Sequence, residues 1–438
     1  MNGQATLAKL RAGKLTGAKR LDLSCGLTQL PDEVFDLADS LEVLNLSGNQ
    51  LTNLPHSMGR LHKLKIIFGS NNLFTHLPES LGECAALEVV GFKATRIRHV
   101  PTQALPPKLR WLILTDNAVD TLPEALGERP ALQKLMLAGN RLKALPEGLE
   151  RAQRLELLRL SANHFETLPG WLTRLPRLAW LALAGNPLGW QTVNSAPLPG
   201  IEWSNLRLGE RLGEGASGHI FRVHVGESPP LALKLFKGAV TSDGLPEHEI
   251  AGSLAAGPHA LLCTPVAELA NHPDGTRGIF LPLLPTELTN LAGPPSMDSC
   301  TRDVYPRHFH LSAESALALA RQMLAGLGHL HGRGVMHGDF YAHNILWEPV
   351  SCNAILSDMG AACVMPSNQP ALKRDLLALE VRAFGIFLEE LVAHVPLAEL
   401  TVEGSAALRT LKNGARICMA LNPADRPDLA CFALNWGD

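Results

Sequence analysis

Leucines recur through the first half of the chain in a short and regular pattern. Leu-x-Leu-x-x-Asn-x-Leu, followed by Leu-Pro or Val-Pro, returns every 22 to 24 residues. Its asparagine position is occupied by Cys25, Asn49, Asn72, Thr95, Asn117, Asn140, Asn163 and Asn186. A unit of this length cannot bury its own leucines, so the units must stack on one another. The pattern predicts about eight short strands, each followed by a turn at which the asparagine satisfies backbone groups.

This pattern resembles the leucine-rich repeat over about residues 15 to 190. The resemblance implies a parallel-sheet solenoid that carries its function on the concave face, at the strand positions between the leucines. Those positions are mostly apolar: Val43, Asn45, Ile66, Phe68, Val89, Lys93, Trp111, Ile113, Lys134, Met136, Leu157, Arg159 and Trp180. Such a stripe predicts a surface for a protein partner or substrate. The alternative is that the second half of the chain folds back and covers it.

The repeat pattern ends at Asn186-Pro187. Residues 191–205 are rich in Pro, Gly and small polar residues, which is typical of a cap and a semi-extended linker. An open solenoid end would expose its core, and Trp190 and Trp203 are well placed in sequence to seal it.

From Leu206 onward the hydrophobic pattern changes to that of a mixed domain. Two strand-like runs flank Gly213, Gly215 and Gly218, which favours a hairpin whose backbone amides can approach phosphate oxygens. The next apolar run contains Lys234. A lysine in such a strand is costly unless it meets anions, and phosphates with a carboxylate would supply them.

Two acidic residues of the following helix, Glu247 and Glu249, can supply that carboxylate, and Lys237 is the alternative phosphate lysine. Further on, the pattern predicts an edge strand that runs through Pro282 and an irregular stretch over residues 286–310. Leucines at helical spacing then predict a long helix from Ser312.

The stretch His337-Gly338-Asp339-Phe340-Tyr341-Ala342-His343-Asn344 carries the most chemistry. Asp339 is followed five residues later by an amide, Asn344, and fourteen residues after that by a second acid, Asp358. Phosphoryl transfer needs a group that orients a hydroxyl and oxygen ligands for magnesium. These three side chains can supply both.

In this order and at these spacings, the motifs of residues 206–436 resemble those of the protein kinases. The resemblance implies a bilobal α+β fold that binds ATP and Mg²⁺. It assigns the phosphates to Gly213, Gly215, Gly218 and Lys234, the lysine's partner to Glu249, and the adenine to the backbone near Leu283 and Leu284. It also implies that Asp339 is the catalytic aspartate that orients the substrate hydroxyl or accepts its proton, that Asn344 and Asp358 are the metal ligands, and that His337 braces the loop from within the core.

Several positions depart from that family. Gly338 stands where an arginine is usual, Tyr341 where a lysine is usual, and Met359 replaces a phenylalanine. Only twenty-one residues separate Asp358 from Glu380, so the segment on which peptide substrates usually dock is short. These departures favour two alternatives: a pseudokinase scaffold that mainly binds protein, and a small-molecule phosphotransferase, which shares the His-Gly-Asp sequence.

Composition narrows the other classes of function. A net charge of -3 and a pI near 6.6 provide no basic field for nucleic acid or an anionic membrane. The eight cysteines form no CxxC pair and no zinc-like cluster. Because there is neither an apolar signal nor an eighteen-residue apolar run, we expect a cytoplasmic protein. Export that uses no cleavable signal is compatible with the same sequence.

The sequence therefore predicts an α/β leucine-rich-repeat solenoid over residues 1–190, a linker over 191–205 and a kinase-like domain over 206–438. The two lobes of that domain are expected at 206–284 and 285–438. The predicted function is ATP- and Mg²⁺-dependent transfer to a Ser or Thr hydroxyl of a protein, with a Tyr hydroxyl as the alternative acceptor. The oligomeric state is left open.

Overall fold

The computed structural model describes residues 3–190, 197–215, 218–238, 240–241 and 243–436. The chain forms two compact units, Met1–Leu175 and Pro176–Asp438. The last repeat of the sequence pattern, which contains Asn186, therefore belongs to the second unit. Part of the predicted linker, residues 191–196, lies outside the described residues, as do Ala216 and Ser217 of the glycine-rich hairpin.

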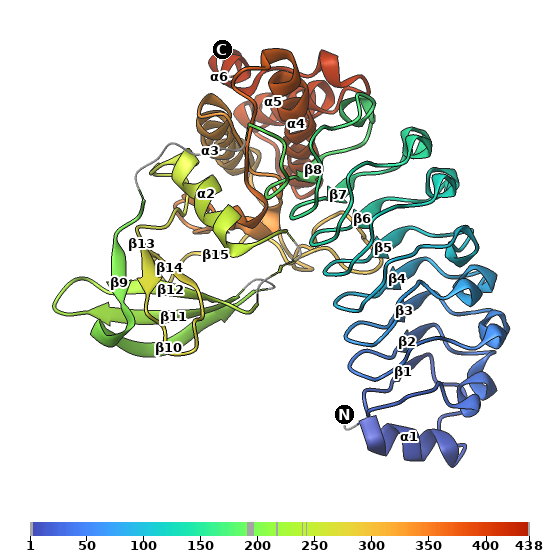
Figure 1. Cartoon of the computed structure of the whole chain (residues 1–438). Helices are drawn as coiled ribbons and strands as arrows, with labels where there is room; N and C mark the ends of the chain where they lie inside the picture. Colours follow the sequence, from blue (N-terminus) through green and yellow to red (C-terminus); the bar gives the residue numbers. More distant parts are fainter. Residues whose placement is uncertain (1–2, 191–196, 216–217, 239, 242, 437–438) are drawn as a thin grey trace. The chain divides into compact units, whose positions relative to one another are not determined.

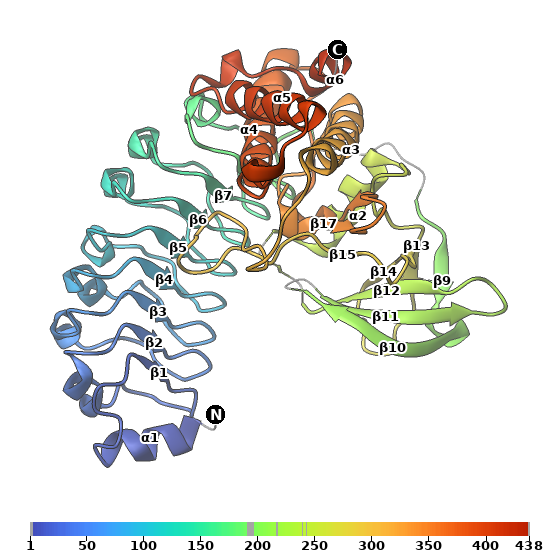
Figure 2. The same cartoon turned by 180° about the vertical axis from the view of Figure 1, so that it is seen from behind.

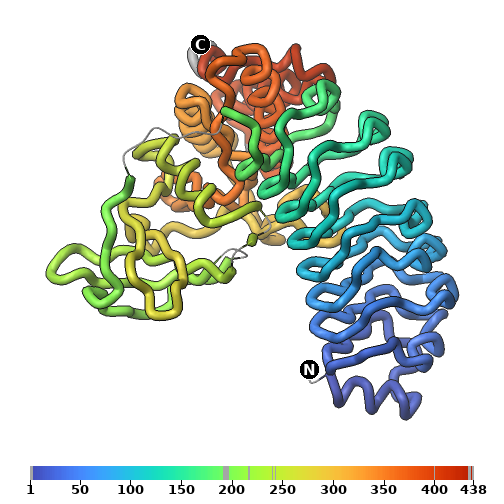
Figure 3. The backbone as a smooth tube through the Cα atoms, viewed as in Figure 1, coloured from blue at the N-terminus to red at the C-terminus, as the bar shows by residue number. Residues whose placement is uncertain are grey.

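The first unit begins with helix α1 (Gly3–Arg11) and continues as a parallel sheet paired in chain order. Its strands are β1 (Arg20–Asp22), β2 (Val43–Asn45), β3 (Ile66–Phe68), β4 (Val89–Gly91), β5 (Trp111–Ile113), β6 (Lys134–Met136) and β7 (Leu157–Arg159). In Figures 1 and 3 each repeat is one turn of chain, with its strand on one side and a 3₁₀ segment on the other. Those segments are η1 (Asp32–Leu37), η2 (His56–Arg60), η3 (Glu79–Glu83), η4 (Thr102–Ala104), η5 (Glu124–Glu128), η6 (Glu147–Arg151) and η7 (Leu172–Arg174). The predicted parallel solenoid is confirmed.

Asparagine performs the predicted task at the turn that follows most of the strands, as Asn140 shows. Asn140 Nδ2 donates to the carbonyl oxygens of Leu114 and Leu137 at 2.8 and 2.9 Å, and its Oδ1 accepts from Val119 N at 3.0 Å. These bonds join neighbouring repeats, because Leu114 and Leu137 belong to successive repeats. The leucines of the pattern are fully buried, as Leu135 is at 0% exposure. Proline fits before the 3₁₀ segments because its missing N–H is not needed there.

The second unit contains a six-stranded sheet in the order β10-β11-β12-β14-β13-β9. Its strands are β9 (Gly200–Glu202), β10 (Leu206–Glu214), β11 (Gly218–Val225), β12 (Leu231–Phe236), β13 (Ala267–Ala270) and β14 (Gly278–Pro282). All neighbours are antiparallel except β9 and β13. Helix α2 (Pro246–Ala256) packs on this sheet through Ile250, which contacts Phe236 and Ile279.

Trp203 does not serve as a seal for the repeats. It lies in η8 (Trp203–Asn205) and packs against the apolar cluster formed by Val223, Leu233, Ala267 and Phe280. Strand β9 pairs with β13 and thereby carries Trp203 over the core of the sheet. The C-terminal end of the segment that the sequence assigned to a linker is thus part of a folded sheet.

The rest of the second unit is mainly helical, as Figure 2 shows. Its helices are α3 (Ala313–Gly332), α4 (Pro370–Ala393), α5 (Val402–Cys418) and α6 (Leu429–Asn435). The sequence correctly placed the start of α3, where the Ser312 side chain accepts a hydrogen bond from Ser315 N. Five short strands and the last repeat complete the unit: β8 (Trp180–Ala182), β15 (Thr289–Asn290), β16 (Val335–Met336), β17 (Ile345–Trp347), β18 (Ala354–Leu356) and β19 (Cys363–Val364). No helix among the described residues is long and apolar enough to cross a membrane.

Candidate functional site

Lys234 occupies the middle of β12 and is 7% exposed. Its Nζ lies 2.6 Å from Oε1 of Glu249, on α2, and 3.9 Å from Oδ1 of Asp358. Burial alone would lower the pKa of the Lys234 ammonium, but the carboxylates of Asp358 and Glu249 outweigh burial and raise its pKa. The lysine is therefore charged. Of the two acids that the sequence offered, Glu249 is the partner, whereas Glu247 pairs with Arg277.

The glycine-rich stretch joins β10 to β11 in an antiparallel hairpin, as its sequence predicted. Gly213 pairs with Ile220, and Gly215 N donates to the Gly218 carbonyl at 3.0 Å. Lys237 lies at this hairpin, where its Nζ contacts Glu214 and donates to the Gly215 carbonyl at 2.9 Å. Lys237 therefore belongs to the hairpin, and Lys234 is the lysine that meets Glu249 and Asp358.

Asp339 and Asn344 contact each other directly. Nδ2 of Asn344 donates to Oδ2 of Asp339 at 3.0 Å and to its backbone carbonyl at 2.9 Å. The first bond holds the carboxylate of Asp339, which is half-buried, against the amide five residues later. The second bond holds the backbone of the same residue. The amide oxygen of Asn344 takes no part in either bond.

The hairpin of β17 and β18 brings Asp358 close in space to Asn344. Ile345 pairs with Leu356, and Ser357 N donates to the Asn344 carbonyl at 2.8 Å, so Asn344 and Asp358 follow neighbouring strand ends. Asp358 has a left-handed backbone, with φ 57°, and its Oδ1 accepts from Gly360 N at 3.1 Å. Its side chain is 46% exposed.

Asn344 and Asp358 offer one amide and one carboxylate oxygen ligand. Mg²⁺ prefers oxygen ligands and is commonly held by one or two protein side chains together with substrate phosphates. Over the described part of the chain, no cluster of three or more His, Cys, Asp or Glu side chains could hold a metal unaided. The donor set therefore fits an ion that arrives with a phosphate ligand, and it does not fit a permanently bound structural metal.

Leu283 and Leu284 directly follow β14, between the sheet and the helical part of the unit, and both are half-buried. His337 is fully buried, with Nε2 at 3.0 Å from the Ser357 carbonyl. It thus links the stretch that contains Asp339 to the residue before Asp358.

Glu380, in the middle of α4, holds the loop that contains Asp339 and is 1% exposed. Its carboxylate accepts from His337 N at 3.1 Å and from Gly338 N at 2.7 Å, and Nε2 of His331 lies 2.9 Å away. Burial raises the pKa of Glu380, but the hydrogen bonds from His331 and the Gly338 amide outweigh burial, so the pKa is lowered overall. A single ionised carboxylate thus holds the backbone just before Asp339.

The structure explains why glycine stands at position 338. Its φ is 76°, and a Cβ there would lie 2.7 Å from the carbonyl oxygens of Ala361 and Leu181. The arginine that the kinase resemblance expects at this position has no room unless the backbone shifts. The packing around the loop therefore favours glycine at position 338, and this explains the departure from the kinase pattern at that position.

Asp303 is a part of the site that the sequence did not identify. Its side chain is fully buried, and its carboxylate accepts from His343 N at 3.0 Å and lies 2.7 Å from His343 Nδ1. Burial lowers the pKa of His343, but the hydrogen bond to Asp303 outweighs burial and the pKa is raised. Asp303 comes from the irregular stretch 286–310, forty residues earlier, where no periodicity marks a single acid as special.

A second acid, half-buried, lies near Asp303. Glu390, on α4, accepts a hydrogen bond from Tyr305 Oη at 3.2 Å. Burial, together with the nearby carboxylate of Asp303, raises the pKa of Glu390 to about 8.

This shift predicts that stability falls as the pH rises. Between about pH 5 and about pH 8 the folded state keeps a proton on Glu390 that the unfolded chain has released, so folding is progressively opposed. Glu390→Gln removes the titration and should flatten the slope of unfolding free energy against pH by about 1 kcal/mol per pH unit. Urea unfolding across this range measures the slope. Glu389→Gln, at an exposed neighbour on the same helix, is the control and should change nothing. Equal slopes for wild type and Glu390→Gln would contradict the prediction.

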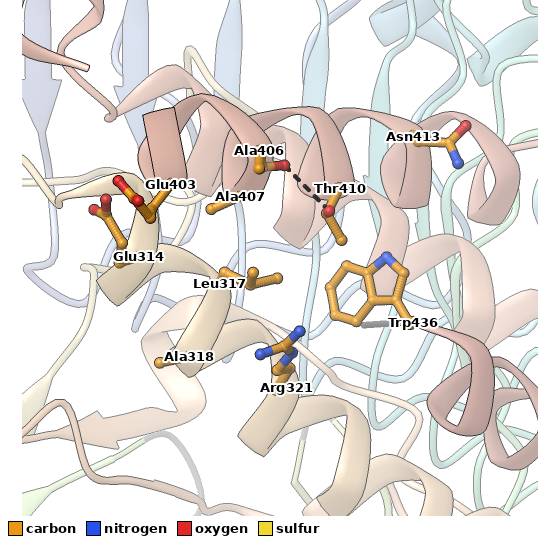
Figure 4. A pocket seen from close by; sticks show the side chains of 10 residues that line it. All are labelled: Glu314, Leu317, Ala318, Arg321, Glu403, Ala406, Ala407, Thr410, Asn413 and Trp436. Atoms are coloured by element: carbon orange, nitrogen blue, oxygen red, sulfur yellow. Dashed lines mark hydrogen bonds between the residues drawn. The ribbon is translucent and has the colours of Figure 1, made fainter. Parts of the chain in front are cut away.

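A hollow of about 610 Å³ lies elsewhere in the unit, between α3, α5 and α6. Figure 4 shows Glu314 and Glu403 near one end and Arg321 and Trp436 facing each other near the other. None of the residues discussed above lines it, so it is separate from the Lys234 site.

Comparison with known proteins supports the repeats directly. Residues 40–61 and 130–188 match family models described as leucine-rich repeat. A solved structure of a leucine-rich-repeat protein from Leptospira interrogans is 24% identical and covers 41% of this chain and 63% of its own, with a TM-score of 0.28. The family models therefore show that the chain contains leucine-rich repeats, as its sequence predicted.

The comparison for enzymatic function is more distant. A probable cyclin-dependent serine/threonine-protein kinase of Dictyostelium discoideum is 27% identical over 160 residues, or 36% of this chain and 23% of that protein. The chain thus matches less than a quarter of this relative's length. The similarity links the chain distantly to a protein named as a kinase.

Proposed function

We propose that this protein is a protein kinase that transfers the γ-phosphate of ATP to a Ser or Thr hydroxyl. The observation that carries the proposal is the set of contacts around Lys234. A charged, buried lysine bridges Glu249 and Asp358, while Asp339 is fixed by Asn344 at the neighbouring strand end. A lysine between two acids is positioned for phosphate oxygens, and the distant relative named as a kinase agrees with this use.

In this proposal each side chain has one task. The amides of the β10–β11 hairpin and Lys234 bind the phosphates, and Glu249 holds the lysine in place. Asn344 and Asp358 would hold Mg²⁺, which neutralises charge on the transferring phosphoryl group. Asp339 accepts the proton of the substrate hydroxyl while the hydroxyl oxygen bonds to the γ-phosphorus. At the same time, the bond between the γ-phosphorus and the β-phosphate oxygen breaks.

The proposal assigns the bilobal kinase-like fold to residues 206–438. The six-stranded sheet with α2 is the smaller lobe, and α3 to α6 form the larger one. Leu283 and Leu284 would then contact adenine through their backbone. All eight cysteines are free thiols, which fits the reducing cytoplasm as the compartment in which the protein works.

The leucine-rich repeats are proposed to recruit the protein partner or substrate. Two apolar strand positions, Ile66 and Phe68, are half-buried where a soluble surface is usually polar, whereas the positions of Val89, Trp111 and Leu157 are buried. The segment after Asp358, on which peptide substrates of kinases usually dock, is short. A substrate that is held by the repeats has less need of that segment.

A phosphate-transfer assay with labelled ATP and Mg²⁺, comparing wild type with Asp339→Ala, tests the proposal. Protein, peptide and small-molecule acceptors are supplied in parallel, and autophosphorylation is followed. Transfer to protein that Asp339→Ala abolishes supports a protein kinase. Transfer only to small acceptors, or nucleotide binding with no transfer at all, overturns it in favour of a small-molecule phosphotransferase or a pseudokinase.

Lys234→Met should abolish stabilisation by nucleotide. A ligand at one hundred times its Kd stabilises the folded state by about 2.7 kcal/mol, and this term disappears when the phosphates lose their lysine. The measurement is the change in melting temperature on adding ATP and Mg²⁺. Lys237→Met, at the neighbouring lysine on the hairpin, is the matched control and should keep most of the shift. If Lys237→Met loses the shift and Lys234→Met keeps it, the lysine assignment is wrong.

A further inference from the structure

The last leucine-rich repeat, residues 176–188, packs against the loop that contains Asp339. Its strand β8 presents Trp180, which is 1% exposed and lies in the same compact unit as the loop. Trp180 Nε1 donates to the Phe340 carbonyl at 2.8 Å, and its ring stacks on Tyr341 at 4.2 Å with an interplanar angle of 5°. The two residues that follow Asp339 are therefore held by one side chain of the repeat.

Other atoms of the repeat reach the residue on the opposite side of Asp339. The Leu181 carbonyl lies so close to Gly338 that a Cβ there would be 2.7 Å from it. Arg302 adds a contact from above the ring, with its guanidinium carbon 5.7 Å from the Trp180 centroid. The loop is thus confined between Glu380 on α4 and the strand of the last repeat.

Two arginines fasten the repeat to the helical part of the unit. Arg426 donates to the Pro176 carbonyl at 2.9 Å and also to the Ala378 carbonyl at 2.9 Å. Arg382 donates to the Arg177 carbonyl at 3.2 Å. Both arginines are largely buried, and both use backbone carbonyls of the repeat as acceptors. The repeat is therefore bonded to the helices independently of Trp180.

The turn after β8 also touches the helix that carries Glu249. A Cβ on Gly185 would lie 2.0 Å from Cε1 of His248, so the imidazole packs directly against this glycine. His248 is the residue before Glu249 on α2. The last repeat thus contacts both elements that place the charged groups of the site, the loop of Asp339 and helix α2.

We propose that the last repeat is a built-in positioning element for the kinase site, with Trp180 as its principal positioning residue. This inference rests on the proposed function, because it concerns the rate of the same transfer. Residues 359–369 lie between Asp358 and α4, and they contact the loop where the Ala361 carbonyl approaches Gly338 and where β19 pairs with β16. The repeat adds support on Phe340 and Tyr341, so the loop is held in place by packing.

The test uses the full chain with Trp180→Phe and Trp180→Leu. Phe keeps an aromatic ring on Tyr341 and loses the Nε1 donor, whereas Leu loses both. A small displacement of catalytic groups can cost about a hundredfold in rate. We expect kcat to fall by about tenfold for Phe and by about a hundredfold for Leu, with KM for ATP nearly unchanged. Hydrogen exchange of a peptide that spans residues 337–345 should become faster in the same order.

Trp171→Phe is the matched control. Trp171 is also buried, at 4% exposure, and its Nε1 has no hydrogen-bond partner among the described residues. It should lower the melting temperature to a similar extent and leave both kcat and exchange over 337–345 unchanged. Unchanged kcat or unchanged exchange in Trp180→Leu overturns the inference. If wild type transfers no phosphate, the proposed function fails, while the exchange measurement still decides whether the repeat holds the loop.

Discussion

Asp339→Ala is expected to lower the rate of phosphoryl transfer by about 10²- to 10⁴-fold, the usual contribution of a positioned general base. Asn344 donates one hydrogen bond to the carboxylate of Asp339 and one to its backbone carbonyl, and Glu380 anchors the backbone just before it. Because Lys234, Glu249 and the glycine hairpin are untouched, stabilisation by ATP should persist. Loss of rate without loss of binding separates a role in chemistry from a role in nucleotide affinity.

The measurement is initial-rate transfer from labelled ATP, with the ATP-dependent melting shift recorded on the same samples. Asp375→Ala removes an exposed carboxylate that pairs with Arg374 on α4, and it serves as the control that should retain the full rate. A transfer rate in Asp339→Ala equal to that of this control would show that Asp339 is not the acid that handles the hydroxyl proton.

Glu380→Ala is expected to destabilise the protein by about 3–5 kcal/mol, the cost of removing one partner from a buried charged network. Without the carboxylate, the amides of His337 and Gly338 and the ring of His331 lose their acceptor in a site that water does not reach. Urea unfolding measures the loss, and Glu389→Ala, at an exposed position further along α4, should shift the midpoint little. A loss below about 1 kcal/mol would mean that water replaces the carboxylate and that the anchor is unimportant.

Glu380 and Glu390 of α4 should make contributions to stability that depend on pH with opposite sign. The pKa of Glu380 is lowered in the folded state, so its stabilisation is present above the ordinary carboxylate pKa and is lost as the pH falls through the folded value. The pKa of Glu390 is raised to about 8, so its contribution is lost as the pH rises. The difference arises because Glu380 faces donors, whereas Glu390 faces the carboxylate of Asp303.

The roles of some residues could be predicted, because they depend on a pattern in the neighbouring sequence. Asn140 recurs at a fixed spacing and makes the backbone bonds that the turn requires, and Ser312 caps the helix whose leucines follow at helical spacing. Lys234 was identifiable because an ionic side chain inside an apolar strand requires a partner. Each of these signals is contained within one repeat, one strand or one helix.

Asp303 and Trp180 carried no such signal. Asp303 is one acid in an irregular stretch, and Trp180 looked like any other strand position of the repeat. Their roles depend on contacts with His343 and with Phe340 and Tyr341, which are 40 and 160 residues away. The sequence showed only that Gly338 departs from the kinase pattern, whereas the structure shows that glycine fits between the carbonyl oxygens of Ala361 and Leu181.

The sequence by itself determined the repeat solenoid, the order of the glycine hairpin, lysine, acid and amide motifs, and the elements that carry them, because these follow from periodicity and from the cost of a polar group in an apolar segment. Only the tertiary structure decided that Glu249 and not Glu247 meets Lys234, that Glu380 and Asp303 hold the loop, and that the last repeat belongs to the unit that contains the site. These outcomes depend on packing between distant segments, and no local pattern encodes which distant surface a side chain will meet.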